Sequence, residues 1–377
     1  MSDDDSAIED GESGQGAALR DVLPPRENPA LFGHDAAEAA FLGAFNAGRL
    51  PHAWLIAGPR GIGKATLAFR IARFLLAQGA GESGTSLFGG EATPITSLAI
   101  PPESPPFRLV ASGGHPDLLL VERGWDQRKK KLRSEIVVDD TRAIAGFLHL
   151  TPSQGAWRIV ILDGADDMNR NAANAVLKVL EEPPKRAVLL LTSESPGRLL
   201  ATIRSRCRRL NLKKLSQDIV LEAISKAVPE LNAADAQTLA QLAEGSIGRG
   251  LALAAADGLD IHRGLYKLLG EMPKPRAESL HRFADSLIRG EAEGYRLMSE
   301  LLPAAVARLA VLALGRERDT DPAERAALAR LAARRRPDQW VEVWRKICHL
   351  FAAADAVDLD KKAVVLNAFF AVEEAAR

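Results

Sequence analysis

Short runs of apolar residues alternate with amphipathic stretches through the first half of the chain. Residues 54–57 and 159–162 are consecutive apolar positions, and each run is short enough for a buried strand. Apolar positions then recur every three or four residues from Thr66 to Leu75, and Ala165 to Leu180 forms a second predicted helix. Strands that alternate with helices are typical of a parallel sheet wound with crossover helices. We therefore predict an α/β domain over residues 26–214.

The second half of the chain has a different pattern. Residues 215–258 are predicted to form a small helical lid, and residues 259–377 an all-helical C-terminal domain. Late in this stretch large apolar residues recur every three or four positions, which marks one buried face of a helix. These residues are Trp340, Trp344, Ile347 and Phe351. A stripe of this kind usually belongs to an internal core.

Three segments depart from regular patterning. Residues 1–25 combine Asp, Glu, Ser and Gly with few large apolar side chains, which predicts a disordered acidic tail. Residues 77–116 are rich first in Gly and then in Pro, which predicts a long irregular surface insertion. The basic run 128–133 could contact a nucleic-acid backbone, and a solvated hairpin tip explains it at least as well.

Composition narrows the classes of protein. The 377 residues include 49 basic and 49 acidic side chains, so the formal net charge is zero and composition alone predicts no DNA binding. Cys207 and Cys348 lie far apart, which supports neither a disulfide framework nor a cysteine-rich zinc site and fits a reducing cytoplasm. No apolar run approaches a membrane span, and the acidic N-terminus differs from the basic start of a secretion signal. We expect a cytoplasmic protein with no membrane partner.

A phosphate-binding loop directly follows the first predicted strand. Residues 58–64 read Gly-Pro-Arg-Gly-Ile-Gly-Lys and precede a helix. In such a loop the glycines let backbone amides turn toward the phosphates, the helix N-terminus adds its positive end, and the lysine reaches the terminal phosphates. A glycine-rich turn with an unrelated lysine is the simpler interpretation, but the strand, loop and helix occur in the order that phosphate binding requires. The candidate nucleotide-binding residues here are Gly58, Gly61, Gly63 and Lys64.

The magnesium-binding part of this nucleotide site is incomplete. The position after the lysine normally carries a Ser or Thr hydroxyl that holds magnesium, but here it is Ala65. Thr66 is a candidate contact, yet it lies about 100° further round the helix and should not replace that ligand. Asp163 ends the second strand where a Walker B aspartate would order the water around magnesium, and Gly164 stands where active ATPases usually place a glutamate. Nucleotide binding stays open, and magnesium-dependent hydrolysis is not expected.

Polar residues also end a later apolar run, at Thr192 and Ser193. Related ATPases keep a polar sensor of the γ-phosphate at the end of such a strand. A hydrogen bond that caps the strand explains the same residues equally well. The seven histidines show no metal-ligand spacing, so no histidine is assigned to chemistry.

Several motifs together resemble a known family. They are residues 49–54 (Arg-Leu-Pro-His-Ala-Trp), 114–117 (Gly-His-Pro-Asp), 158–184, which end in Leu-Glu-Glu-Pro-Pro, and 205–207 (Ser-Arg-Cys). The chain resembles the DNA polymerase III clamp-loader subunits, gamma/tau and delta-prime, from about Asn28 to its C-terminus. The resemblance implies an AAA+ fold, in which a P-loop NTPase-like parallel sheet is followed by a helical lid and an all-α collar that holds subunits in a ring.

Departures from the family pattern favour its delta-prime branch. Ala65 and Gly164 both match that branch, whose role is largely structural and acts on neighbouring subunits. Gamma/tau carries a sensor arginine in a Gly-Ser-x-Arg context, whereas residues 245–249 read Gly-Ser-Ile-Gly-Arg, so Gly248 holds that position. A four-cysteine zinc module commonly lies where residues 77–113 lie here, and this stretch has no cysteine, so no zinc is expected.

The resemblance assigns Arg206 as an arginine finger that reaches the ATP of a neighbouring gamma/tau subunit. A guanidinium is planar and permanently charged, which suits phosphate oxygens and stabilises the transition state. A solvated basic edge made by Arg204, Arg206, Arg208 and Arg209 is the simpler interpretation. We assign the finger to Arg206 alone. Cys207 is expected to be a small packing residue, because no partner base is evident.

The resulting hypothesis is a delta-prime subunit that helps to load the beta sliding clamp onto primed DNA. Its expected partners are gamma/tau, delta, the clamp and, through the assembled complex, primer–template DNA. No polymerase active site is recognisable, and no cofactor is required, although weak binding of ATP or ADP at the degenerate loop stays open. One alternative is an autonomous AAA+ ATPase of the gamma/tau type or another AAA+ machine, which Lys64 and Asp163 support. Another is a purely architectural protein, for which Arg206→Ala would leave the ATPase of the loader unchanged.

Overall fold

The computed structural model describes residues 23–78, 94–126, 131–153, 157–255, 257–289, 293–316, 322–357 and 359–377. The chain divides into two compact units. The first comprises Arg20–Leu231 and Ala240–Gly250, and the described part of the second comprises Asn232–Leu239 and Leu251–Arg377. The predicted boundaries at residues 214 and 258 stay predictions. The predicted tail lies outside the described residues except for residues 23–25.

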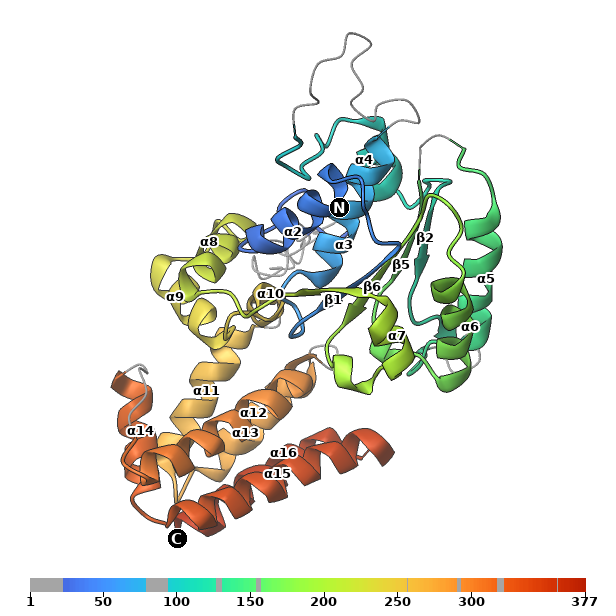
Figure 1. Ribbon diagram of the computed structural model, residues 1–377. Coiled ribbons are helices and arrows are strands. Elements are labelled where there is room, and N and C mark those ends of the chain that lie inside the picture. Colours follow the sequence, from blue (N-terminus) through green and yellow to red (C-terminus); the bar gives the residue numbers. More distant parts are fainter. Residues whose placement is uncertain are drawn as a thin grey trace, which may run out of the picture. The chain divides into compact units, whose positions relative to one another are not determined.

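The first unit is built on a parallel sheet with the strand order β2-β5-β6-β1-β7 (Figure 1). Its strands are β1 (Ala53–Ala57), β2 (Leu118–Val121), β5 (Arg158–Leu162), β6 (Ala187–Ser193) and β7 (Arg208–Asn211). Strands β1, β5 and β6 are buried along their whole length, as expected for a sheet covered by helices on both faces. This arrangement confirms the predicted AAA+ α/β fold class.

Helices cover both faces of this sheet (Figure 1). They are α2 (Asp35–Asn46), α3 (Lys64–Ala77), α5 (Val138–His149), α6 (Arg170–Glu181) and α7 (Ala201–Arg206). Trp54 and Ile56 of β1 join one core with α2 and α3, whereas Ala53 and Leu55 join another with α5, α6 and α7. Alternate side chains of a strand point to opposite faces, so β1 contributes to both cores.

The described part of the predicted insertion is more regular than its composition suggested. Residues 105–111 form helix α4 (Pro105–Ala111), and the Leu98 and Val110 side chains are fully buried. The Arg73 guanidinium of α3 lies 4.4 Å from the centre of the Phe107 ring. The prediction of an irregular surface excursion therefore needs correction for residues 94–116, because apolar side chains among the prolines pack onto the sheet's helical layer. Residues 79–93 lie outside the described residues.

The basic run is also only partly described. A short hairpin pairs β3 (Trp125–Asp126) with β4 (Lys131–Leu132), and residues 127–130 lie outside the described residues. The expected hairpin is therefore observed at its base. Contact of this run with nucleic acid stays a prediction.

Helices α8 (Gln217–Ala227), α9 (Ala233–Leu242) and α10 (Ile247–Ala255) follow the sheet in sequence, and the remaining helices are all in the second unit. These are α11 (Gly258–Glu271), α12 (Ala277–Arg289), α13 (Glu293–Ala313), α14 (Pro322–Ala332), α15 (Pro337–Val357) and α16 (Lys361–Ala376). The predicted helical character of this region is confirmed. None of the helices within the described ranges is long and apolar enough to cross a membrane.

The predicted apolar stripe of α15 is correct at three of its four positions. Trp340, Ile347 and Phe351 are buried, whereas the Trp344 residue is 40% exposed. Trp344 lies about 40° round the helix from Trp340, at the rim of the buried face. The sequence spacing alone did not distinguish the rim of the stripe from its centre.

Candidate functional site

The phosphate-binding loop connects the end of β1 to the start of α3. Gly61 and Gly63 have φ angles of 72° and 106°, in the left-handed region that glycine adopts without strain. Gly63 caps the N-terminus of α3, whose first residue is Lys64. The His34 Nε2 atom donates a hydrogen bond of 2.7 Å to the carbonyl oxygen of Ile62 and so braces the loop from behind. The sequence prediction of strand, loop and helix in this order describes the local structure correctly.

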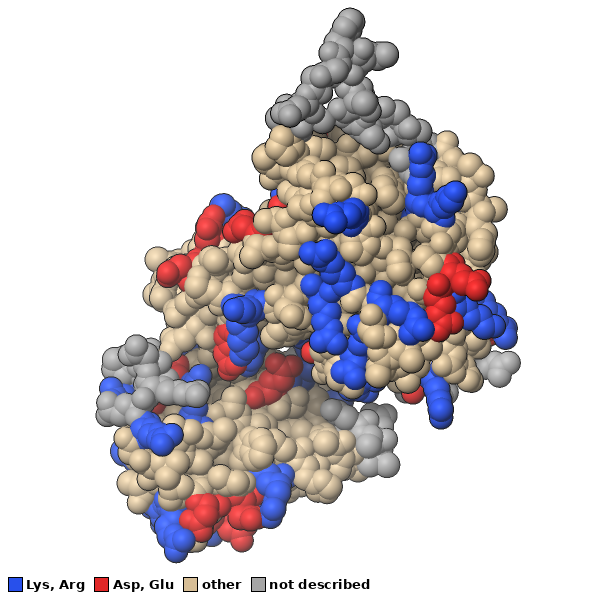
Figure 2. All heavy atoms as spheres, viewed as in Figure 1, with Lys and Arg blue, Asp and Glu red and all other residues tan. Residues whose placement is uncertain are grey.

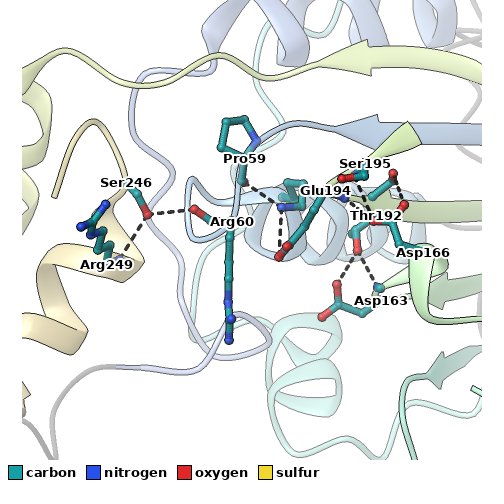
Figure 3. A network of polar contacts seen from close by, with 12 residues as sticks. Pro59, Arg60, Asp163, Asp166, Thr192, Glu194, Ser195, Ser246 and Arg249 are labelled. Carbon is teal, nitrogen blue, oxygen red and sulfur yellow. Dashed lines mark hydrogen bonds and ion pairs between the residues drawn. The ribbon is translucent and has the colours of Figure 1, made fainter. Parts of the chain in front are cut away.

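The Lys64 amino group has partners inside the protein (Figure 3). Its Nζ atom donates a hydrogen bond of 2.8 Å to the carbonyl oxygen of Pro59 and lies 3.9 Å from Oε1 of Glu194. Burial lowers the pKa of Lys64, and the nearby carboxylates of Glu194, Asp163 and Asp166 oppose this shift. The carboxylate of Glu194 therefore supplies negative charge where a terminal phosphate would supply it.

The polar residues that end β6 are bonded to acids that follow β5 (Figure 3). Thr192 Oγ1 donates a hydrogen bond of 2.5 Å to Asp163 Oδ1 and accepts one of 2.8 Å from the Gly164 amide. Ser193 Oγ donates a hydrogen bond of 2.7 Å to Asp166 Oδ1. Both hydroxyls thus tie the ends of two neighbouring strands together, which is the strand-capping role. A sensor role for either residue stays a prediction.

Gly164 occupies the position of the missing glutamate for a backbone reason. Its φ angle is 79°, in the left-handed region where a residue with a Cβ atom is strained. A glutamate in this backbone conformation would be strained. The backbone conformation after Asp163 therefore favours glycine over a residue that could polarise water.

Helix α10 contacts the phosphate-binding loop through backbone atoms. The Gly248 amide donates a hydrogen bond of 2.8 Å to the Gly61 carbonyl oxygen, and Ser246 Oγ donates one of 2.9 Å to that of Arg60. A Cβ atom at Gly248 would lie 2.9 Å from the Gly61 Cα atom, closer than real Cβ contacts. The family's sensor arginine thus has no room at this position.

The displaced arginine of this motif, Arg249, faces a different group. Its NH1 atom lies 3.6 Å from Oε1 of Glu244, and its backbone amide donates a 3.2 Å hydrogen bond to Ser246 Oγ (Figure 3). Helix α10 approaches the loop too closely at Gly248 to leave space for a side chain. The arginine of this motif is found one residue later, at Arg249.

Arg206 is the last residue of α7, just before β7. Its NH2 atom lies 3.0 Å from Oε1 of Glu181, the last residue of α6, and its NH1 atom donates a 3.1 Å hydrogen bond to the carbonyl oxygen of Thr202. The Arg206 side chain is 36% exposed. Its guanidinium is therefore held by two groups and still reaches solvent.

Arg206 and the phosphate-binding loop lie at opposite ends of the parallel strands, so they are at opposite edges of the sheet along the strand direction. The loop follows the carboxyl end of β1, whereas Arg206 precedes the amino end of β7, which pairs in parallel with β1. Five residues of β1 separate the two edges, a length of about 13 Å along the strand. This geometry places Arg206 away from the chain's own nucleotide site.

A basic strip begins at Arg204 and Arg206 and runs along β7 to Lys213 and Lys214, which lie beyond the opposite end of that strand. Between residues 204 and 214 there are six basic and no acidic residues, and β7 lies at one end of the sheet order. Figure 2 shows Lys and Arg side chains in a band across one face of the α/β unit. The exposed members of the strip are Arg206, Arg208, Arg209, Lys213 and Lys214. This surface is suited to an anionic partner.

The neighbouring Cys207 is a packing residue in the structure. It is buried, and burial raises the pKa of its thiol to about 11. At pH 8 only about 10⁻³ of this thiol is ionised, and the thiolate is the reactive form.

We predict that a thiol-modifying reagent at pH 8 modifies half-buried Cys348 at least tenfold faster than Cys207. Peptide mass spectrometry over time measures both rates. Equal rates in the folded chain would contradict the packing role, and the same chain in denaturant is the control.

The structure brings most predicted nucleotide-site residues to one edge of the sheet. Gly58, Gly61, Gly63 and Lys64 follow β1, and Asp163 follows the next but one strand, β5. Thr66 lies in the first turn of α3, one residue beyond Ala65. Within the described ranges no group of three or more His, Cys, Asp or Glu side chains could hold a metal ion. The sequence analysis did not predict that Glu194 pairs with Lys64 or that Glu181 pairs with Arg206.

Comparison with known proteins supports the same family. Residues 33–216 match the family model described as DNA polymerase III, delta subunit. Over 195 residues the chain is 37% identical to DNA polymerase III subunit delta-prime of Pseudomonas aeruginosa, which covers 52% of this chain and 53% of that protein. The matched part of this chain is similar to the DNA polymerase III delta-prime and gamma/tau subunits. It includes the phosphate-binding loop, Asp163 and Arg206.

Relatives of the gamma/tau branch match as well. The tau subunit of Escherichia coli is 29% identical over 297 residues, which cover 75% of this chain and 42% of that protein. A gamma subunit-related protein of Thermotoga maritima, known from a crystal structure, is 18% identical, with a TM-score of 0.41, and covers 89% of this chain and all of that one. The chain matches about half the length of these curated relatives.

Proposed function

We propose that this chain is the delta-prime subunit of a bacterial clamp loader and that it completes the ATP site of a neighbouring gamma/tau subunit with Arg206. The observation that carries the proposal is the position of Arg206 at the edge of the sheet opposite the chain's own phosphate-binding loop. A cation at this edge cannot reach a nucleotide on Lys64, so it is available only to another molecule. Similarity to the delta-prime and gamma/tau subunits supports a gamma/tau subunit as that molecule.

The chemistry of the surface suits this role. Arg206 offers a permanently charged guanidinium whose planar donors match phosphate oxygens, and such a group stabilises the charge that develops during phosphoryl transfer. Arg208 and Arg209 of the basic strip lie close to it in the sequence, so a neighbour's triphosphate would approach a positive surface. The remaining parts of the proposal are delta as a second partner, the beta sliding clamp as the object loaded, and primer–template DNA met by the assembled complex in the cytoplasm.

The chain's own site is not built for hydrolysis. The loop amides and Lys64 suit phosphate oxygens, so weak binding of ATP or ADP is compatible with the loop. The residues at the positions that would bind magnesium and activate water lack the groups that hydrolysis needs. Ala65 lacks the coordinating hydroxyl, and Gly164 lacks a carboxylate. We therefore propose no catalytic step on this chain's own nucleotide, and no zinc.

An autonomous ATPase of the gamma/tau type is the second candidate, because Lys64 is retained and the Asp163 carboxylate is held by Thr192 at the end of the same site. Steady-state hydrolysis of ATP by the purified chain separates the two candidates. We predict turnover no higher than that of the Lys64→Ala variant. Hydrolysis by the wild-type chain that is lost in Lys64→Ala would contradict our proposal and favour the autonomous ATPase.

A further inference from the structure

The contact between Arg206 and Glu181 joins two helices that end at the same place. Glu181 is the last residue of α6, and Pro183 and Pro184 follow shortly after it and prevent the helix from continuing. Arg206 is the last residue of α7. Leu180 and Cys207, which directly neighbour Glu181 and Arg206 in the sequence, are both buried in the same core. The bases of both side chains are therefore fixed by packing.

We propose that Glu181 is a positioning residue that holds the Arg206 guanidinium in the orientation needed at the neighbour's nucleotide; this inference rests on the proposed function. The 3.0 Å contact from NH2 to Glu181 Oε1 and the 3.1 Å hydrogen bond from NH1 to the Thr202 carbonyl oxygen engage both terminal nitrogens. Two anchors on different helices restrict rotation of the guanidinium plane more than either alone.

The anchors leave donors available. A guanidinium has five N–H groups, of which the hydrogen bond to Thr202 uses one, while the NH2 group forms an ion pair with Glu181. The remaining donors can face phosphate oxygens, which is consistent with a side chain that is 36% exposed. An arginine side chain has many rotamers, and ordering it costs conformational entropy at the moment of use. The contact with Glu181 orders the arginine side chain before the neighbour's nucleotide is engaged, so the arginine is pre-organised.

The contact is not explained as a stabilising salt bridge. The Glu181 side chain is 50% exposed, and pairs exposed to this degree contribute little to folding stability. We therefore expect Glu181→Gln to leave the melting temperature within about 2 °C of wild type. An effect of this variant on the neighbour's chemistry would then arise from orientation.

The test uses the full chain in a loader reconstituted with gamma/tau and delta subunits of the same organism, the clamp and primed DNA. With the other gamma/tau sites of this loader inactivated, we expect Glu181→Gln to lower kcat for ATP about tenfold, with KM for ATP changed less than about twofold, because orientation matters most in the transition state. Glu181→Asp, which keeps the carboxylate, should recover part of the loss. Glu182→Gln removes the same charge from the adjacent exposed residue and should match wild type.

A double-variant comparison decides whether Glu181 acts through Arg206. If it does, Glu181→Gln adds no further loss to the Arg206→Ala chain. An equal additional loss in that background would overturn the inference, as would unchanged or faster turnover of Glu181→Gln alone. If Arg206→Ala turns over like wild type, the proposed function fails as well. If only Arg206→Ala is slow, the proposed function stands and the positioning role fails.

Discussion

Replacing Arg206 by alanine is expected to slow ATP hydrolysis at the neighbouring gamma/tau site roughly 10³-fold, equivalent to about 4 kcal/mol of transition-state stabilisation. The reason is that charge accumulates on the transferred phosphoryl oxygens and must be stabilised by a cation. The exposed guanidinium at the end of α7 can do so. Single-turnover hydrolysis in a reconstituted loader whose other gamma/tau sites are inactivated measures the effect at one site.

Arg209→Ala is the matched control for this experiment. It removes the same charge from the same basic strip, on exposed β7, three residues from Arg206. Because a strip of charge acts by steering and a finger by contact, the control should change hydrolysis less than about threefold. Similar losses for both variants would show that the strip acts as a diffuse positive surface and that Arg206 has no special role.

Replacing Asp117 by alanine is expected to lower the free energy of unfolding by about 3–5 kcal/mol. Its carboxylate is fully buried, lies 3.4 Å from NH2 of Arg158 and accepts a hydrogen bond of 2.8 Å from the Ser153 amide. Arg158 is itself buried, so the substitution leaves its charge without that carboxylate. Urea unfolding followed by circular dichroism, analysed for the first transition if the units unfold separately, measures the change.

A surface acid provides the control for this stability prediction. Glu222 pairs with Lys226 on α8 at 2.6 Å, and the two side chains are more than half exposed. Glu222→Ala should cost no more than about 0.5 kcal/mol. Equal effects of the two substitutions would mean that Asp117 and Arg158 do not form the buried pair that connects the starts of β2 and β5.

The fold of the first unit could be predicted because its signals are local. A run of apolar residues, three glycines and a lysine specify the strand, loop and helix around Lys64 without any distant contact. The position of Arg206 at the opposite end of the strands was not predicted, because it depends on the parallel pairing of β7 with β1. The loop around Lys64 was therefore accessible from the sequence, and the placement of Arg206 was not.

The contacts that refine the site could not be predicted in this way. Gly248 and Gly61 are separated by about half of the chain, and only the approach of α10 to the loop shows why an arginine is absent. Glu181 belongs to a recognised motif, but its spacing from Arg206 gives no sign that the two side chains meet. Buried α4 was missed because its prolines and glycines indicated a loop, while Phe107 and Val110 packed inward.

The central claim is that Arg206 acts on a nucleotide held by another subunit. The most direct measurement compares ATP hydrolysis by the reconstituted loader containing this chain as Lys64→Ala with the loader containing it as Arg206→Ala. We predict that the Lys64→Ala chain supports turnover close to wild type and that the Arg206→Ala chain does not. Loss of turnover with Lys64→Ala, together with normal turnover with Arg206→Ala, would show that the chain's own loop is the catalytic one and would contradict this account.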